Sequence, residues 1–131
     1  MTEQLIRSAA VLQVRDVVAS AKFYRESLGF TGHSLWGEPP CFGIVGRGTV
    51  TVFLDQIAPD KEITLNHYWA AYIYVEDVNA LVDEFRNRGA EILREPEDQP
   101  YGCRDFDVRD LDGHVIAFGQ DLVPGPAGPG L

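Results

Sequence analysis

Apolar and polar positions along the chain alternate with a period of two in some segments and of about 3.6 in others, and this succession occurs twice. The apolar run AAVLQV precedes a helical pattern that ends at Gly29, and AAYIYV precedes another that ends at Gly89. Three strand-like segments follow each helical pattern, separated by turn signals such as EPP, GRG, QPYG and DLDG. The pattern predicts one β-strand, one helix and three strands, followed by the same series again.

A short internal repeat supports this division. Residues 14–17 read VRDV and residues 75–78 read VEDV, an offset of 61 positions. In both copies the Asp is a preferred helix N-cap, and the Gly that ends each helical pattern suits a helix C-terminus. Each helix has one apolar face, so it should cover one face of a sheet and leave the other face free.

These observations predict a single α+β domain over residues 1–122, built from repeat units at about 5–57 and 66–122. Residues 123–131 form a tail rich in Pro and Gly, which we expect to be disordered.

Composition and charge exclude several classes of function. The 131 residues carry a formal net charge of −9, which argues against nucleic acid and against an anionic membrane surface as partners. No stretch approaches the roughly 20 apolar residues of a membrane span, and the first residues lack the layout of a secretory signal. We therefore expect a cytoplasmic protein in which Cys41 and Cys103 are reduced thiols.

Four segments resemble signatures of one known family. They are VLQVRDVVASAKFYRESLGF, WGEPPCFGIVGRG, AYIYVEDVNALVDEFRNRGAEI and YGCRDFDVRDLDGHVIAFGQ, and together they span nearly all of residues 9–121. In this order they resemble the vicinal-oxygen-chelate superfamily, which includes glyoxalases, bleomycin-resistance proteins and dioxygenases. The resemblance implies two βαβββ units whose curled mixed sheets surround a concave pocket, and it implies a homodimer.

The enzymes of that superfamily hold a divalent metal in the pocket, whereas its bleomycin-binding members sequester a drug without a catalytic metal. The resemblance places the metal ligands of the enzymes at four positions, which here carry Ala9, Phe53, Ala70 and Ala117. None of these side chains can bind a metal ion, and the three histidines show no mutual spacing typical of a metal site. We therefore expect no metal and no other cofactor.

Strand alternation assigns side chains to the face that the helices leave free. The residues expected to line a ligand pocket there are Gln13, Trp36, Phe53, Asp55, Tyr72, Tyr74, Asp105 and Asp107. Two alternatives remain open at this point. The aromatic rings can instead fill a collapsed interior, and Asp105 and Asp107 can instead be solvated or paired with Arg104 and Arg109.

The expected lining combines aromatic rings with carboxylates and contains no Lys or Arg. Aromatic faces attract flat π-systems and cations, and carboxylates favour cations over anions. The sequence therefore predicts metal-independent binding of a small organic molecule, aromatic and cationic, similar to antibiotic sequestration by bleomycin-resistance proteins. The alternative is a lyase or isomerase similar to the glyoxalases and dioxygenases, with displaced metal ligands.

Overall fold

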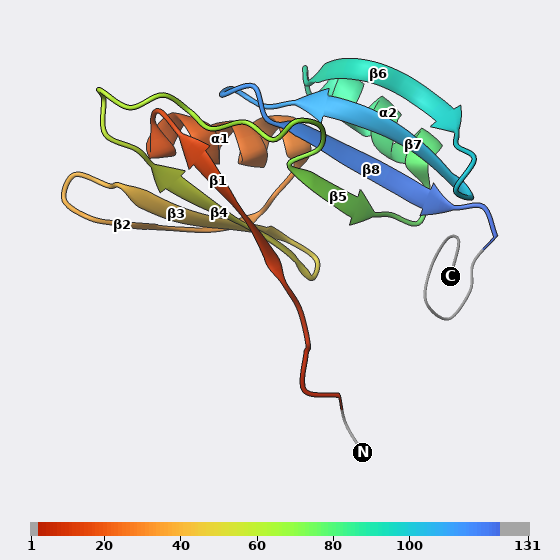
Figure 1. Ribbon diagram of the computed structural model, residues 1–131, viewed down its shortest axis with the longest axis horizontal. Helices are drawn as coiled ribbons and strands as arrows, with labels where there is room; N and C mark the ends of the chain where they lie inside the picture. Colours follow the sequence, from red (N-terminus) through yellow and green to blue (C-terminus); the bar gives the residue numbers. More distant parts are fainter. Residues whose placement is uncertain (1–2, 124–131) are drawn as a thin grey trace. The chain divides into compact units, whose positions relative to one another are not determined.

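The computed structural model describes residues 3–123, and the expected disorder of the tail concerns residues that lie almost wholly outside this range. The described chain forms two compact units that divide after Thr64. Each unit contains one helix and one four-stranded sheet, as the repeat predicts (Figure 1). The predicted α+β class and βαβββ succession are thus confirmed.

The first unit contains β1 (Ala9–Val14), α1 (Val17–Leu28), β2 (Gly32–Trp36), β3 (Phe42–Arg47) and β4 (Val50–Gln56). Its strands lie in the order β1-β4-β3-β2, with β1 parallel to β4 and the other pairs antiparallel. The helix α1 packs against one face of this mixed sheet (Figure 1). The opposite face carries no helix of this unit.

The second unit contains β5 (Ala71–Tyr74), α2 (Val78–Asn87), β6 (Glu91–Asp98), β7 (Cys103–Arg109) and β8 (Val115–Asp121). Its strand order, β5-β8-β7-β6, repeats that of the first unit, with β5 parallel to β8. The helix α2 again covers one face only. In residues 3–123 no helix is long and apolar enough to cross a membrane.

The helix ends follow the signals in the sequence. Asp16 accepts hydrogen bonds from the backbone N–H groups of Val18 and Ala19, and Asp77 caps α2 in the same way. Gly29 takes up the left-handed conformation (φ 70°) that ends α1, which a residue with a Cβ adopts only with strain.

A second cap joins each helix to the end of its own sheet. The side-chain oxygen of Gln56, at the end of β4, accepts the N–H of Val17 at 2.8 Å. Gln120 on β8 accepts the N–H of Val78 at 2.9 Å. These bonds satisfy donors that a helix N-terminus otherwise leaves unpaired, and they link each helix to the last strand of its own sheet.

The core of each unit lies between helix and sheet. In the first unit it contains Leu12, Val14, Val52 and Leu54 from the strands, all at most 4% exposed. In the second unit Phe106 and Phe118 stack at 5.5 Å, and Phe85 of α2 meets both rings edge-on. Strand alternation predicted these inward positions correctly.

One strand departs from regular alternation. In β6 the register against β7 shifts by one residue between Ile92 and Arg94, and again between Arg94 and Glu97. Ile92 lies opposite Val108, so an unbroken register would place Arg94 opposite Phe106, in the core beneath α2. The bulge instead places Arg94 opposite Asp107, on the helix-free face.

Candidate functional site

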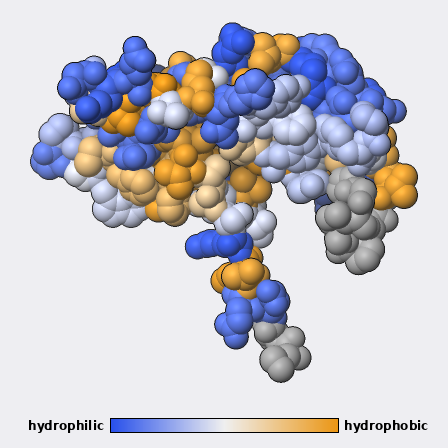
Figure 2. Space-filling view, in the orientation of Figure 1, coloured by the Kyte–Doolittle hydropathy of each residue, from blue (hydrophilic) through white to orange (hydrophobic). Residues whose placement is uncertain are grey.

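The helix-free face of the first unit is rich in aromatic and aliphatic side chains. Register pairs Phe53 of β4 with Val11 of β1 and Ile44 of β3, and it pairs Trp36 of β2 with Phe42 of β3. Trp36 is 49% exposed and Val11 is 62% exposed, so residues of the first unit leave much of this face accessible to solvent. Figure 2 shows apolar side chains gathered over these strands.

Three rings on this face form a continuous cluster. Phe42 lies between the other two, with centroid distances of 6.1 Å to Trp36 and 5.6 Å to Phe53. Phe42 is absent from the predicted pocket lining, which includes Trp36 and Phe53, although alternation along CFGIVG places it on the same face. Trp36, Phe42 and Phe53 together form the aromatic face of the first unit.

Asp55 stands beside the aromatic face as an exposed carboxylate. It lies opposite Phe42 on β3 and opposite Gln13 on β1. Among the described residues no salt bridge involves Asp55. The side chain of Gln13 is engaged, because its amide oxygen accepts the backbone N–H of Thr64 at 2.7 Å. The four predicted site residues of this unit therefore share one face, with Asp55 as its carboxylate.

The helix-free face of the second unit holds a buried ion-pair network instead. Asp105 and Asp107 of β7 lie on this face, as alternation predicts, but they are only 0% and 5% exposed. The guanidinium of Arg94 joins them: Nη2 lies 2.6 Å from Asp105 Oδ1, and Nε lies 3.0 Å from Asp107 Oδ2. The expectation of a face without Lys or Arg is therefore wrong.

The alternative partners that the sequence suggested are also wrong. Arg104 pairs with Asp98 at 3.0 Å, and Arg109 pairs with Glu91 at 3.2 Å, both near the surface. Alternation along the sequence does not predict that Arg94 shares a face with Asp105 and Asp107, because only the bulge in β6 turns its side chain toward them.

Asp105 accepts a full set of hydrogen bonds. Arg94 and Gln99 donate to Oδ1 at 2.6 and 3.2 Å, and the phenols of Tyr72 and Tyr101 both donate to Oδ2. Burial alone would raise the pKa of Asp105, but the hydrogen bonds from Tyr101, Arg94 and Tyr72 outweigh it and lower the pKa. Burial, together with hydrogen bonding to Asp105, raises the pKa values of both phenols, which remain protonated donors.

Tyr72 reaches Asp105 only because β8 carries a glycine between them. Tyr72 lies on β5, Asp105 lies on β7, and β8 runs between these strands. A Cβ built on Gly119 would lie 2.0 Å from the Tyr72 hydroxyl oxygen, so the phenol passes directly over this residue. Tyr74, two residues further along β5, is 61% exposed, and its ring lies 5.3 Å from that of Tyr72.

Asp107 accepts hydrogen bonds from two side chains. Trp69 Nε1 donates to Oδ1 at 3.0 Å, and Arg94 donates to both carboxylate oxygens. Trp69 also contacts the rings of Tyr68, Tyr72 and Tyr101, with centroid distances from 4.8 to 6.4 Å. The structure therefore brings Tyr72, Asp105 and Asp107 together in a network that is internally satisfied.

The donor set does not fit a divalent metal. The positions that the resemblance implies as ligands are Ala9 in β1, Phe53 in β4, Ala70 before β5 and Ala117 in β8, none of which has a donor atom. Within residues 3–123 no three His, Cys, Asp or Glu side chains are grouped in a way that could hold a metal ion.

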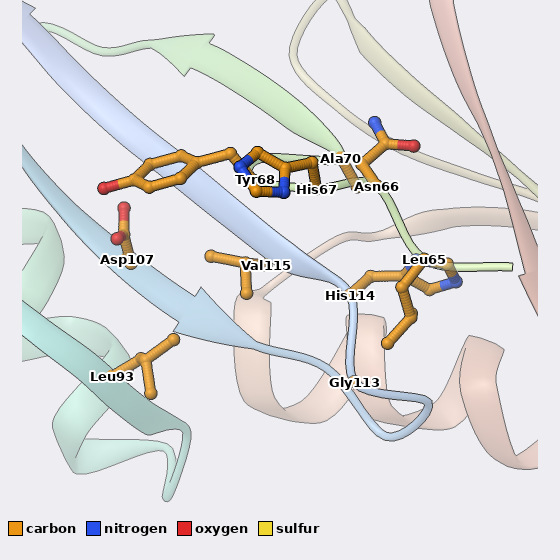
Figure 3. A pocket seen from close by; sticks show the side chains of 10 residues that line it. All are labelled: Leu65, Asn66, His67, Tyr68, Ala70, Leu93, Asp107, Gly113, His114 and Val115. Atoms are coloured by element: carbon orange, nitrogen blue, oxygen red, sulfur yellow. The ribbon is translucent and has the colours of Figure 1, made fainter.

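A pocket of about 300 Å³ opens beside this network within the second unit (Figure 3). Its walls come from the segment before β5, from the turn between β7 and β8, and from single positions on β6, β7 and β8. The lining residues are Leu65, Asn66, His67, Tyr68, Ala70, Leu93, Asp107, Gly113, His114 and Val115.

Only Asp107 of this lining belongs to the site residues that the sequence predicted. His67 and His114 are 47 positions apart, so their spacing gave no signal, yet both line this pocket. The string NHYWA, which concentrates polar and aromatic residues at the start of the second repeat unit, was the one sequence feature that could have drawn attention to this wall.

The comparisons with known proteins agree with this architecture. The family model described as "Glyoxalase/Bleomycin resistance protein/Dioxygenase superfamily" matches residues 7–118. No curated protein matches the sequence.

Several solved structures share the fold. A glyoxalase-related enzyme from Clostridium phytofermentans is 17% identical, with a TM-score of 0.72 over 91% of this chain and 97% of its own. A glyoxalase/bleomycin resistance protein/dioxygenase from Nocardioides is 20% identical, with a TM-score of 0.69 over 98% and 91%. The bleomycin-binding protein of Streptomyces verticillus, solved with copper(II)-bleomycin, is 24% identical, with a TM-score of 0.68 over 89% and 97%.

Proposed function

This chain belongs to the Glyoxalase/Bleomycin resistance protein/Dioxygenase superfamily, and from that premise we propose that it binds a flat, cationic aromatic molecule without a metal ion. The observation that carries the proposal is the aromatic face of the first unit, with the exposed carboxylate of Asp55 at its side. The biological role would be sequestration of such a molecule, as in the bleomycin-binding protein of similar fold.

The aromatic face supplies attraction for a flat ligand. Ring contacts and cation–π contacts contribute about 0.5–2 kcal/mol each, most when the site is desolvated. Trp36 is half exposed, so a ligand that stacks on it removes apolar surface from water. Phe42 and Phe53 extend the contact beyond one ring, which favours a molecule with fused or linked rings.

Electrostatics select the charge of this ligand. Asp55 is exposed and has no cationic partner among the described residues, so its carboxylate is available to a ligand. The net charge of −9 adds a weaker, screened attraction for cations. Asp105 and Asp107 play no direct part in this proposal, because both carboxylates are buried and already paired with Arg94.

Metal independence rests on the absence of donor atoms at Ala9, Phe53, Ala70 and Ala117. A metal-dependent lyase or isomerase would need such donors elsewhere, and the described residues offer no group of three. The free thiols of Cys41 and Cys103 are compatible with the cytoplasm, where we propose that the protein acts.

We also propose that the chain forms a homodimer. The strands β1 and β2 form open edges of the first sheet, and β5 and β6 form open edges of the second, which association would cover. Light scattering should give twice the chain mass of 14.5 kDa at tens of micromolar. A mass of one chain at that concentration would contradict the dimer.

Fluorescence titration tests the ligand class. Proflavine, a cationic acridine, should bind and quench Trp36, whereas acridine-9-carboxylate should bind at least about tenfold more weakly. Phe53→Ala should weaken proflavine binding about five- to thirtyfold, and Asp55→Asn about two- to fivefold. Asp60→Asn, an exposed carboxylate of the same unit, is the matched control and should change nothing.

Two outcomes would contradict the proposal. One is tighter binding of the anionic acridine. The other is equal loss of affinity in Asp55→Asn and Asp60→Asn, which would mean that only the overall charge matters.

A further inference from the structure

The second unit has another pocket at the corner where β5 and β8 end and α2 begins. This corner pocket has a volume of about 290 Å³ and is lined by Tyr74, Val75, Glu76, Gln120 and Asp121. It shares no lining residue with the pocket of Figure 3 or with the aromatic face, so binding there is independent of the proposed function. We infer that the corner pocket binds an arginine side chain of an extended peptide.

The internal repeat gives the corner pocket a counterpart in the first unit. The offset of 61 positions relates Arg15 to Glu76, each directly before the Asp that caps its helix. Gln56 and Gln120 also correspond, because each accepts the backbone N–H of the first residue of its helix. Asp121, which follows Gln120, therefore corresponds to the residue after Gln56.

In the first unit the chain itself occupies this corner. The N–H of Ile57, directly after β4, donates to the carbonyl oxygen of Val14 at 3.1 Å, so the chain turns toward β1. Arg15 Nη1 then donates to the carbonyl oxygens of Ala58 and Pro59, at 3.5 and 3.4 Å. A polypeptide segment is thus held at this corner by the side chain that precedes the helix cap.

In the second unit the chain takes a different course. The N–H of Leu122 donates to the carbonyl oxygen of Gly102 at 2.9 Å, so the chain beyond β8 stays beside β7, on the side of β8 away from β5. Within the described part of the second unit the corner therefore remains a pocket. Glu76 stands there in the place of Arg15, so the charge of the corner is reversed.

Charge and an exposed ring select the ligand of the corner pocket. Among residues 3–123 no salt bridge involves the carboxylate of Glu76 or of Asp121. Asp121 Oδ1 lies 3.6 Å from the thiol of Cys103, which is only a weak donor. Tyr74 is 61% exposed and adds an aromatic wall. A guanidinium can stack on such a ring and donate two parallel hydrogen bonds to a carboxylate, which an ammonium cannot do.

The size of the corner pocket limits how much of a ligand enters it. A volume of about 290 Å³ lies just below the range of sites that enclose drug-sized molecules. It therefore suits one long side chain, while the rest of the peptide lies outside the pocket.

A titration with matched peptides tests the charge and shape of the ligand. The probes are acetyl-Ala-Arg-Ala-amide, its citrulline analogue, which is neutral and of the same shape, and its lysine analogue. The arginine peptide should shift the NMR signals of the Val75, Glu76 and Asp121 amides in the full chain in a saturable manner. The citrulline peptide should bind about tenfold or more weakly because it lacks the charge, and the lysine peptide about threefold or more weakly. Equal affinity of the arginine peptide and either analogue would overturn the assignment of a guanidinium.

Variants locate the binding. Glu76→Gln should weaken the arginine peptide about two- to fivefold, and Glu76→Arg, which introduces the residue type of the first unit, about tenfold or more. Asp83→Asn is the matched control, because it removes one charge from an exposed position of α2 outside the lining, and it should leave the affinity unchanged. Phe53→Ala should also leave it unchanged, whereas it weakens proflavine. Full retention of affinity in Glu76→Arg, or equal losses in Glu76→Gln and Asp83→Asn, would refute the site.

Discussion

Replacing Arg94 by Met tests the network that the bulge in β6 creates. Met retains much of the aliphatic length of Arg but removes the guanidinium, which leaves Asp105 and Asp107 buried at 0% and 5% exposure without their cation. Removing one partner of a buried ion pair is strongly destabilising, because the remaining charge stays desolvated and uncompensated.

The expected loss is about 3–5 kcal/mol of unfolding free energy at neutral pH. For a chain of this size that corresponds to a fall in Tm of about 10–20 °C. The matched control is Arg109→Met, which breaks the exposed pair between Arg109 and Glu91 and should cost no more than about 1 kcal/mol.

The pH dependence gives a second, independent signature. In the native protein the pKa of Asp105 lies below its ordinary value of 3.8, so its stabilising contribution is present above that value and is lost as pH falls through the lowered pKa. In Arg94→Met, burial should dominate and raise the pKa of Asp105, so the folded variant takes up a proton more readily than the unfolded chain. The variant should therefore gain stability as pH falls from 7 toward 5.

Urea denaturation of both proteins at a series of pH values measures the two effects together. A loss below about 1 kcal/mol, with the same pH dependence as the native protein, would refute the view that Arg94 compensates two buried charges.

Three further predictions concern the second unit and the metal. Gly119→Ala should lower the unfolding free energy measured by urea denaturation by about 2–4 kcal/mol, because a Cβ 2.0 Å from the Tyr72 hydroxyl must displace the ring from Asp105. This loss should largely vanish in a Tyr72→Ala background, where no phenol is displaced. Gln120→Ala should lower the unfolding free energy by about 1 kcal/mol through loss of the bond to the N–H of Val78, while Gln120→Glu, which keeps an acceptor, should cost less in the same measurement. Elemental analysis of purified protein should find well below one Zn, Ni, Mn or Fe per chain; a full equivalent whose removal by a chelator also abolishes an activity would contradict metal independence.

The sequence by itself determined the architecture, because the features that specify it are local and occur twice. The N-cap Asp16 and its repeat Asp77 gave the helix starts, and Gly29 gave the end of α1. Period-two alternation correctly divided β7 into Phe106 and Val108 toward α2 and Asp105 and Asp107 away from it. Such signals depend only on neighbouring residues, so they can be read without knowledge of the partners.

Contacts between elements that are distant in the sequence could not be predicted in this way. The Gln caps join the end of a strand to the start of a helix about 40 residues away, and nothing local marks Gln56 or Gln120 as an acceptor for those N–H groups. Tyr72 reaches Asp105 across β8 because Gly119 has no side chain, and this depends on the strand order. His67 and His114 line the same pocket, which also depends on the strand order.

Arg94 shows most clearly what only the tertiary structure decided. Regular alternation from Ile92 would direct its side chain toward Phe106 and the core, where an unpaired guanidinium would be costly. A one-residue shift in the pairing of β6 with β7 moves the side chain to the opposite face and onto two carboxylates. A shift of one residue in register moves a side chain to the other face of the sheet. A single bulge, which the local sequence does not specify, therefore decided that the helix-free face of the second unit contains its own cation.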